Sequence, residues 1–284
     1  MKEVSIIIPA YNEEESIGET LDQVKEAMDQ SGVIYEIIVV DDGSTDGTAR
    51  IVRERGVNLL QHPSNLGYGA SLKAGIRRAR YSIIAITDAD GSYPSWKIPA
   101  LLESIDEYDM VVGARVGQRV SIPLMRRPAK WLLTRLANYL IGKEIPDLNS
   151  GLRVFKKEIA LALFRVLPSG FSFTATITLA MLANEYLVKF VPIDYYPRVG
   201  RSKIRPIRDT FNFLSLIVRT VMYYSPLKVF MPLSLLFLLA GLIRGGYGIV
   251  SVRNISDSDL LLFVTGMLIG MLGLLADLID KTRL

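Results

Sequence analysis

The sequence predicts an α/β domain with a mostly parallel sheet, followed by a surface helix and a pair of membrane helices. Two observations predict the domain: apolar, β-branched runs end at polar turn residues, and helical patterns lie between these runs. A third observation predicts the membrane pair, because two long apolar runs close the chain. A length of 284 residues suits one large domain, or one domain with an appendage.

The elements of the domain follow from this alternation. We expect strands near residues 4–9, 36–41, 57–60, 83–87 and 109–114. We expect helices near residues 14–30, 46–55, 68–80 and 97–105. Strands that alternate with helices in this way form a mostly parallel sheet. Further along, residues 128–141 have the spacing of a core or interfacial helix, and residues 171–191 resemble a helix that runs into a strand.

The last part of the chain is expected to reach a membrane. The first domain is predicted to cover residues 1–205, and residues 206–226 then form an amphipathic helix, on the membrane surface or packed on the domain. Residues 227–284 contain two apolar runs, with membrane helices expected near 229–252 and 260–279. Lysine and arginine flank both ends of this hairpin, which places both ends in the cytoplasm. A buried pair of soluble helices is the alternative.

Composition narrows the classes of function. The chain has no cysteine and a single histidine, His62, which argues against disulfides, thiolate metal sites, zinc sites built on histidine and Ser-His triads. No signal peptide opens the chain, so the first domain is expected to stay in the cytoplasm. Residues 110–143 and 195–208 contain basic side chains and no acid, which suits phosphate or anionic lipid, or else a solvated positive face. Nucleic acid is not expected as a partner, because no motif for it is found.

Asp88 and Asp90 are the most informative pair of residues. They come directly after the apolar run at 83–87, and residues two apart in an extended strand point to the same side. Two such carboxylates can converge on Mg²⁺ or Mn²⁺, which prefers oxygen ligands and shares its other positions with substrate phosphates. An isolated Asp-x-Asp is more often a polar loop, but two other strand ends here are also polar or acidic.

These strand ends share one edge of the predicted sheet. In open α/β sheets, ligands bind beyond the carboxyl ends of the strands. The residues expected at this edge are Tyr11, Asn12, Glu13, Asp41, Asp42, Ser44, Asp88 and Asp90. The pattern therefore indicates a site for a nucleotide and a metal ion.

Several segments carry a resemblance to a known family. These segments are Pro9-Ala-Tyr-Asn-Glu-Glu, Val40-Asp-Asp-Gly-Ser-Thr-Asp-Gly-Thr, Asn65-Leu-Gly-Tyr-Gly-Ala and Thr87-Asp-Ala-Asp-Gly. They resemble the family 2 glycosyltransferases of GT-A fold, a Rossmann-like architecture. Two further segments, Asp147-Leu-Asn-Ser-Gly-Leu-Arg-Val-Phe and Arg198-Val-Gly-Arg-Ser-Lys, are similar to the polyprenyl-phosphate glycosyltransferases, the group of dolichol-phosphate mannose synthase.

The resemblance implies roles for particular residues. It implies Mg²⁺ or Mn²⁺ on Asp88 and Asp90, with Asp90 and Asp147 at the reacting centre. It implies a donor nucleotide near Pro9, Tyr11, Asn12, Glu13, Asp41, Asp42, Gly67, Lys73, Asp88 and Ala89. Within the basic stretch, Arg115 and Arg127, with Arg126 as substitute, are expected to hold the acceptor phosphate. The donor diphosphate or a closing loop is expected to use Arg153, Arg198, Ser202 and Lys203.

The function that this resemblance implies is an inverting transfer of a hexose from a UDP- or GDP-linked donor to a polyprenyl or dolichyl phosphate. Gly91-Ser-Tyr-Pro follows Asp90 where mannose synthases usually have a Leu-Gln-His-Pro-like segment, so the resemblance does not specify mannose. A family 2 enzyme with another lipid or saccharide acceptor is one alternative, and a non-catalytic membrane scaffold that binds nucleotide is another. A homo-oligomer is possible on this reading.

Overall fold

The structure is a computed structural model. It describes residues 2–117, 134–139, 141–170, 172–198, 215, 218–219, 222–223, 225–251, 254 and 256–281. Most of the predicted amphipathic helix at 206–226 and much of the helix expected at 128–141 therefore lie outside the described residues. Residues 134–139 and 141 of the latter are helical, as expected.

A seven-stranded sheet forms the centre of the α/β domain. Its strands are β1 (Glu3–Ala10), β2 (Ile34–Asp41), β3 (Asn58–Gln61), β4 (Ile83–Ile86), β5 (Met110–Ala114), β6 (Arg153–Lys156) and β7 (Val188–Pro192). They lie in the order β3-β2-β1-β4-β6-β5-β7. Every neighbouring pair is parallel except those that involve β6, which is antiparallel to both β4 and β5. The expectation of a mostly parallel sheet is confirmed, but β6 was not predicted.

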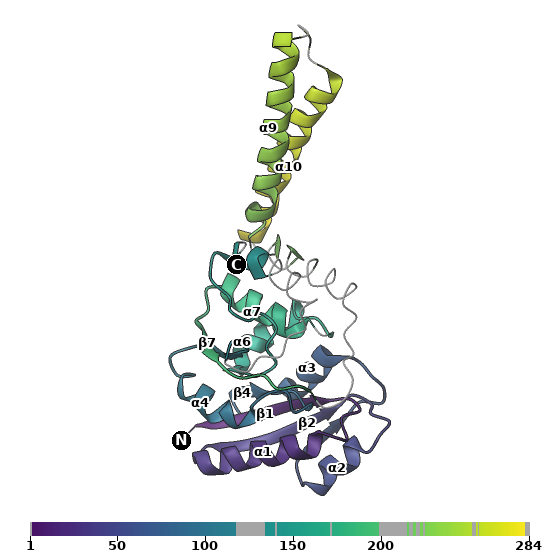
Figure 1. The fold of residues 1–284 in the computed structure, drawn as a ribbon, viewed down its shortest axis with the longest axis vertical. Helices are drawn as coiled ribbons and strands as arrows, with labels where there is room; N and C mark the ends of the chain where they lie inside the picture. The colour runs from purple at the N-terminus through teal and green to yellow at the C-terminus, as the bar shows by residue number, and fades with distance from the viewer. Residues whose placement is uncertain are drawn as a thin grey trace.

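Helices cover both faces of the sheet (Figure 1). One face carries α1 (Ile17–Ser31), α2 (Thr48–Glu54), the short helix η1 (Ser95–Lys97) and α4 (Ile98–Glu103). The other carries α3 (Tyr68–Arg78), α6 (Lys157–Ala162), the short helix η3 (Leu163–Arg165) and α7 (Phe173–Ala183). The α7 and β7 pair confirms the helix and strand expected within 171–191.

Strand β1 explains why both faces need this cover. Ile6 and Ile8 pack in one apolar core with α1, while Ile7 packs in the other core with α3. All three side chains are fully buried, and each contributes roughly 1.5–3 kcal/mol by leaving water. A continuous apolar run of this kind is what a strand buried on both faces requires.

Two long apolar helices form a hairpin that extends away from the domain, on the side of α6 and α7 (Figure 1). These helices are α9 (Leu227–Ser251) and α10 (Asp257–Lys281). Glycines let them pack closely: a Cβ on Gly241 would lie 2.9 Å from the backbone nitrogen of Phe263. Only 11% of the most apolar window of each helix is buried, whereas the core helices of a soluble protein are mostly buried. Both are therefore candidate membrane spans, as predicted.

Charged side chains mark the two ends of the hairpin. Arg244, which interrupts the first apolar run, pairs with Asp259 at 3.0 Å near the connection between the helices. At the other end, the Lys228 ammonium donates to the carbonyl oxygen of Ile141 at 3.4 Å, and Val229 packs on the apolar cluster that contains Ala137 and Ile145. The base of the hairpin thus contacts the domain directly.

Candidate active site

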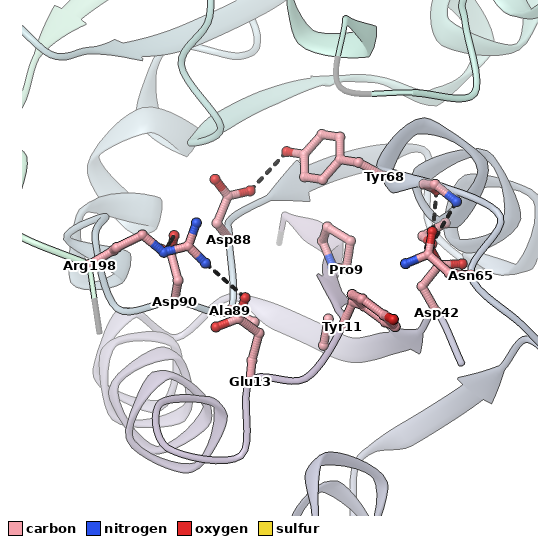
Figure 2. Close-up of a pocket in the computed structure, with 13 residues that line it drawn as sticks. Pro9, Tyr11, Glu13, Asp42, Asn65, Tyr68, Asp88, Ala89, Asp90 and Arg198 are labelled. Carbon is pink, nitrogen blue, oxygen red and sulfur yellow. Dashed lines mark hydrogen bonds and ion pairs between the residues drawn. The ribbon is translucent and has the colours of Figure 1, made fainter. Parts of the chain in front are cut away.

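A cavity of about 190 Å³ lies at the carboxyl edge of the sheet, where β1, β2 and β4 end. Its lining consists of Pro9, Ala10, Tyr11, Glu13, Asp42, Asn65, Gly67, Tyr68, Ser71, Asp88, Ala89, Asp90 and Arg198. The cavity has two ends, separated by Pro9 and Tyr11 (Figure 2). We call them the acidic end, formed by Glu13, Asp88, Asp90 and Arg198, and the amide end, formed by Asp42, Asn65 and Gly67.

Asp88 is held at the acidic end by a tyrosine and a glycine. The Tyr68 hydroxyl donates to Asp88 Oδ1 at 2.8 Å. A Cβ on Gly151 would come within 2.6 Å of Asp88 Oδ2, so only a glycine allows the backbone to approach this closely. Burial, followed by the charge of Asp90, raises the pKa of Asp88 to about 7. The positive charges of Arg115 and Arg198 lower this pKa but do not offset burial and the charge of Asp90.

Asp90 and Glu13 share one cation, the guanidinium of Arg198. Arg198 Nη2 lies 2.9 Å from Glu13 Oε1, and Arg198 Nε lies 3.5 Å from Asp90 Oδ2 (Figure 2). Arg198 Nε is buried and has no hydrogen-bond partner among the described residues. The backbone nitrogen and the hydroxyl of Ser92 donate to the other oxygen of Asp90, which leaves Oδ2 directed at the arginine.

The acidic end suits a hard divalent cation. Across the described residues there is no group of three or more His, Cys, Asp or Glu that could hold a metal ion by itself. Mg²⁺ and Mn²⁺ do not need one, because they commonly take one or two carboxylates and complete their shell with water and substrate phosphates. The adjacent carboxylates of Asp88 and Asp90, with the raised pKa of Asp88, fit that mode of binding.

Asp42 accepts three hydrogen bonds from the fold at the amide end. Its Oδ1 accepts from His62 Nδ1 at 2.7 Å and from the backbone nitrogen of Leu66 at 3.0 Å, and its Oδ2 accepts from the backbone nitrogen of Gly67 at 2.8 Å. Burial alone would raise the pKa of Asp42, but these hydrogen bonds outweigh it and hold the pKa below the ordinary value. Asp42 is therefore an ionised acceptor that the fold already compensates.

The neighbouring aspartate has a different position. Asp41 is fully buried and does not line the cavity; it accepts from the backbone nitrogen of Ser44 and from Gln61 Nε2, both at 3.0 Å. Asn12 is also absent from the lining. Its Oδ1 accepts from the backbone nitrogen of Thr45 at 2.8 Å, so it joins the turns that follow β1 and β2. Asp41 and Asn12, both predicted to contact the donor, therefore hold the loops around the site rather than line the cavity.

Asp147 and Arg115 form a third charged feature. Arg115 donates to Asp147 from Nε at 2.7 Å, from Nη2 at 2.9 Å and from its backbone nitrogen at 3.0 Å. The side chain of Asp147 is 1% exposed and that of Arg115 is 17% exposed. The guanidinium also lies 5.1 Å from the ring centre of Tyr195. This pairing positions the forked face of Arg115 and gives the carboxylate of Asp147 a counter-charge.

Two predicted donor contacts lie away from the cavity. Arg153 is fully buried and donates to the carbonyl of Ser150, the carbonyl of Thr174 and the hydroxyl of Thr178. Burial lowers its pKa to about 10. Lys73 donates to the carbonyl oxygen of Leu167. Neither placement supports contact with a diphosphate or a nucleotide.

The remaining site residues divide into two groups: predicted residues that the structure does not describe, and cavity residues that were not predicted. Arg126, Arg127, Ser202 and Lys203 lie outside the described residues, so their roles stay predictions. Asn65, Tyr68 and Ser71 line the cavity although the sequence assigned them no role. A signal was available for two of them, since Asn65 and Tyr68 flank Gly67 within a recognised segment, but the direction of the turn before α3 could not be inferred from it.

Comparison with sequence families decides the membership of this chain. Residues 5–164 match the family described as Glycosyl transferase family 2, which covers more than half of the chain. The chain belongs to glycosyl transferase family 2. The match includes the strand ends that form the cavity. Residues 225–282 of this glycosyltransferase match a second family, the GtrB C-terminal hairpin, and these residues contain α9 and α10.

Curated relatives extend the likeness beyond the family match. A dolichyl-phosphate hexose transferase of Haloferax volcanii is 30% identical, over 72% of this chain and 87% of the relative. An undecaprenyl-phosphate mannosyltransferase of Micrococcus luteus is also 30% identical, over 71% of this chain and 87% of the relative. The hexosyltransferase Agl6 of low-salt glycan biosynthesis in Haloferax volcanii is 30% identical over 72% of this chain, which spans only 51% of that longer relative.

Solved structures support the GT-A-like fold. Glucosyl-3-phosphoglycerate synthase of Mycobacterium tuberculosis, determined with Mn²⁺, UDP and phosphoglyceric acid, aligns with a TM-score of 0.60 over 78% of each chain. At 20% sequence identity this likeness concerns the fold alone. It confirms the predicted GT-A-like architecture of a mostly parallel sheet.

Proposed function

We propose that this glycosyltransferase moves a hexose from a nucleoside diphosphate sugar to a polyprenyl phosphate at the cytoplasmic face of a membrane. The observation that carries the proposal is the combination of two parts in one chain. One part is a cavity with paired carboxylates at the carboxyl edge of a family 2 domain, and the other is an apolar hairpin whose base contacts that domain. The relatives that act on dolichyl and undecaprenyl phosphate support this acceptor class.

The two ends of the cavity suit the two ends of the donor. Asp88 and Asp90 would hold Mg²⁺ or Mn²⁺, which would neutralise the diphosphate leaving group when bound. Arg198 is placed to contact the same diphosphate once it releases Asp90. At the amide end, Asp42 would contact the base, and Pro9 and Tyr11 would line the path between base and diphosphate.

The acceptor chemistry needs positioning more than proton removal. A phosphate monoester oxygen carries negative charge at neutral pH and is already a nucleophile. It would form a bond to C1 of the sugar while the bond from C1 to the diphosphate oxygen breaks, and the diphosphate would leave with the electron pair. Attack from the side opposite the leaving diphosphate inverts the configuration at C1. Arg115, oriented by Asp147, offers the planar fork that grips phosphate oxygens.

Orientation in the membrane follows from charge. Lys228 lies in the first turn of α9 and Lys281 ends α10, so each end of the hairpin carries a lysine. Short positively charged flanks remain on the cytoplasmic side. In this orientation the α/β domain would lie on the cytoplasmic side, and we expect Arg115 to hold the acceptor phosphate between the acidic end and the lipid surface.

A transfer assay with full-length protein in lipid vesicles tests the proposal. Radiolabelled UDP-hexose or GDP-hexose is supplied with and without undecaprenyl phosphate, and the label in the lipid extract is counted. Label that enters the extract only with the acceptor supports the proposal, and its loss in Asp90→Ala but not in the exposed Asp106→Ala ties it to the site. Label on another acceptor, or binding without turnover, contradicts it and favours the corresponding alternative.

A further inference from the structure

We propose that His62 makes the cavity select a donor whose base offers a single ring N–H, as uracil does, over guanine. The inference rests on the proposed function, in that the cavity holds a nucleoside diphosphate sugar. It concerns the amide end, where Asp42 lies opposite the paired carboxylates of the acidic end (Figure 2). A diphosphate at Asp88 and Asp90 would therefore bring the base toward Asp42.

The hydrogen-bonding capacity of Asp42 can be counted. An ionised carboxylate has about four lone-pair positions, two on each oxygen. His62 Nδ1 and the backbone nitrogen of Leu66 fill both positions on Oδ1, and the backbone nitrogen of Gly67 fills one on Oδ2. One position remains, on Oδ2. Asp42 can therefore accept one further hydrogen bond.

This count distinguishes the two bases. The Watson–Crick edge of guanine presents two adjacent donors, N1–H and the exocyclic amine, which a carboxylate matches by using both of its oxygens. Uracil presents one donor, N3–H, between two carbonyl oxygens. Because Oδ1 is already filled, a guanine would leave one buried donor unpaired, whereas a uracil would be satisfied. An unpaired buried donor costs more than a missing contact, so the filled oxygen discriminates against guanine.

The contact from His62 is held firmly. Its side chain is 12% exposed and that of Asp42 is 5% exposed, and the backbone nitrogen of His62 donates to the carbonyl of Asp41 at 2.9 Å. An ionised carboxylate can only accept, so Nδ1 must carry a proton in this contact. The imidazole therefore acts as a fixed donor that occupies one oxygen of Asp42, and His62 is a positioning residue.

The adjacent residue provides a matched control. Gln61 Nε2 donates to Asp41 Oδ2 at 3.0 Å, so Gln61 and His62, at the end of β3, support two consecutive aspartates. Asp41 does not line the cavity and Asp42 does. Gln61→Ala thus removes a similar contact close by without touching the residue that would read the base.

The test is calorimetric titration of the full-length protein in detergent with UDP and with GDP, in the presence of Mg²⁺. Wild type is expected to bind UDP about tenfold more tightly than GDP, the factor that about 1.4 kcal/mol gives. His62→Ala opens one position on Oδ1, so it should strengthen GDP binding, change UDP binding little and remove most of that preference. In His62→Asn the amide nitrogen takes the place of Nδ1, so the preference should return. Gln61→Ala should leave the ratio unchanged.

The outcomes separate the two claims. Equal binding of UDP and GDP by wild type, or an equal loss of both in His62→Ala, would overturn the role of His62 while the donor site stands. If folded protein, judged by its thermal transition, binds neither nucleotide, the donor site of the proposed function fails and the inference fails with it.

Discussion

The two ends of the cavity contain carboxylates in opposite states. Asp42 receives three hydrogen bonds from the fold, and its pKa lies below the ordinary value. Asp88 receives one from Tyr68, and burial next to Asp90 raises its pKa to about 7. The charge at the amide end is thus compensated by the fold, and the end is in this sense complete before any ligand arrives, whereas the acidic end is electrostatically incomplete. The difference indicates which end reads a neutral group and which end needs a cation.

Asp147 clarifies the comparison because, like Asp42, it is a buried carboxylate that several donors of the fold compensate. It is buried at 1% exposure, yet three donors of Arg115 compensate it. Burial alone therefore does not make a carboxylate in this protein a metal ligand. Within the part of the chain that the structure describes, Asp88 forms no ion pair, and this distinguishes it from Asp147.

The largest expected effect comes from removing charge at the incomplete end. Asp90→Ala should lower the rate of transfer on the order of 10³-fold, because the charge that develops on the diphosphate loses its stabilisation. Steady-state turnover with a lipid phosphate acceptor measures this. Asp106→Ala, an exposed acid outside the cavity, is the control. Activity of Asp90→Ala within a few-fold of wild type would break the comparison.

A smaller effect is expected at the compensated acid. Asp147→Asn releases the fork of Arg115, so the acceptor KM should rise about tenfold while the dissociation constant of UDP changes little. Asp109→Asn is a matched control, since Asp109 also pairs with a cation, Lys156 at 2.8 Å, and lies outside the cavity. A loss of UDP affinity in Asp147→Asn would place this pair at the donor rather than at the acceptor.

The thermal stability of an Arg198 variant, measured with and without Mn²⁺, tests the charge of the acidic end. Arg198 is the cation that Glu13 and Asp90 share, so Arg198→Met should leave the acidic end with a greater excess of negative charge. Mn²⁺ should then raise the thermal transition further in the variant than in wild type, by roughly 2 °C. Arg55→Met, which breaks an exposed pair with Asp22, is the control. An equal effect of Mn²⁺ on the variant and wild type would contradict the proposed metal position.

The smallest effect concerns the complete end under acid. Because the pKa of Asp42 is lower in the folded state, its ionised form contributes stability above the unfolded value of 3.8, and this contribution is lost as pH falls through the folded pKa. Asp42→Asn lacks this contribution at every pH. The unfolding free energy of wild type should therefore fall toward that of the variant as the pH is lowered from about 5 to about 3. Denaturant unfolding followed by tryptophan fluorescence measures the gap, and a gap that widens toward acid would contradict the assignment.

Most of the fold could be predicted because the pattern of burial is local. The five strands expected before residue 115 are all present, and β1, β2 and β4 carry the polar ends that form the cavity. Strand β6 was missed because it is short and its antiparallel place between β4 and β5 depends on distant pairing. The hairpin was predictable from length and hydropathy alone.

The site was predictable where a side chain extends from a strand end and less so elsewhere. The paired carboxylates Asp88 and Asp90 follow from spacing. Spacing does not predict whether Asp41 or Asp42 faces the cavity, because a shift of one residue at the end of β2 decides it. The contact from His62 could not be inferred, since it requires β3 to lie beside β2. Arg153 looked like a ligand for phosphate, but burial among neutral acceptors is a tertiary property.

The most direct test of the comparison is the effect of metal on two ligands that share a base. Calorimetry with full-length protein would measure the affinity of UDP and of uridine, each with and without Mn²⁺. If the acidic end alone needs a cation, Mn²⁺ should tighten UDP binding at least about tenfold and leave uridine binding unchanged. An equal gain for both ligands, or no gain for UDP, would contradict the separate roles of the two ends.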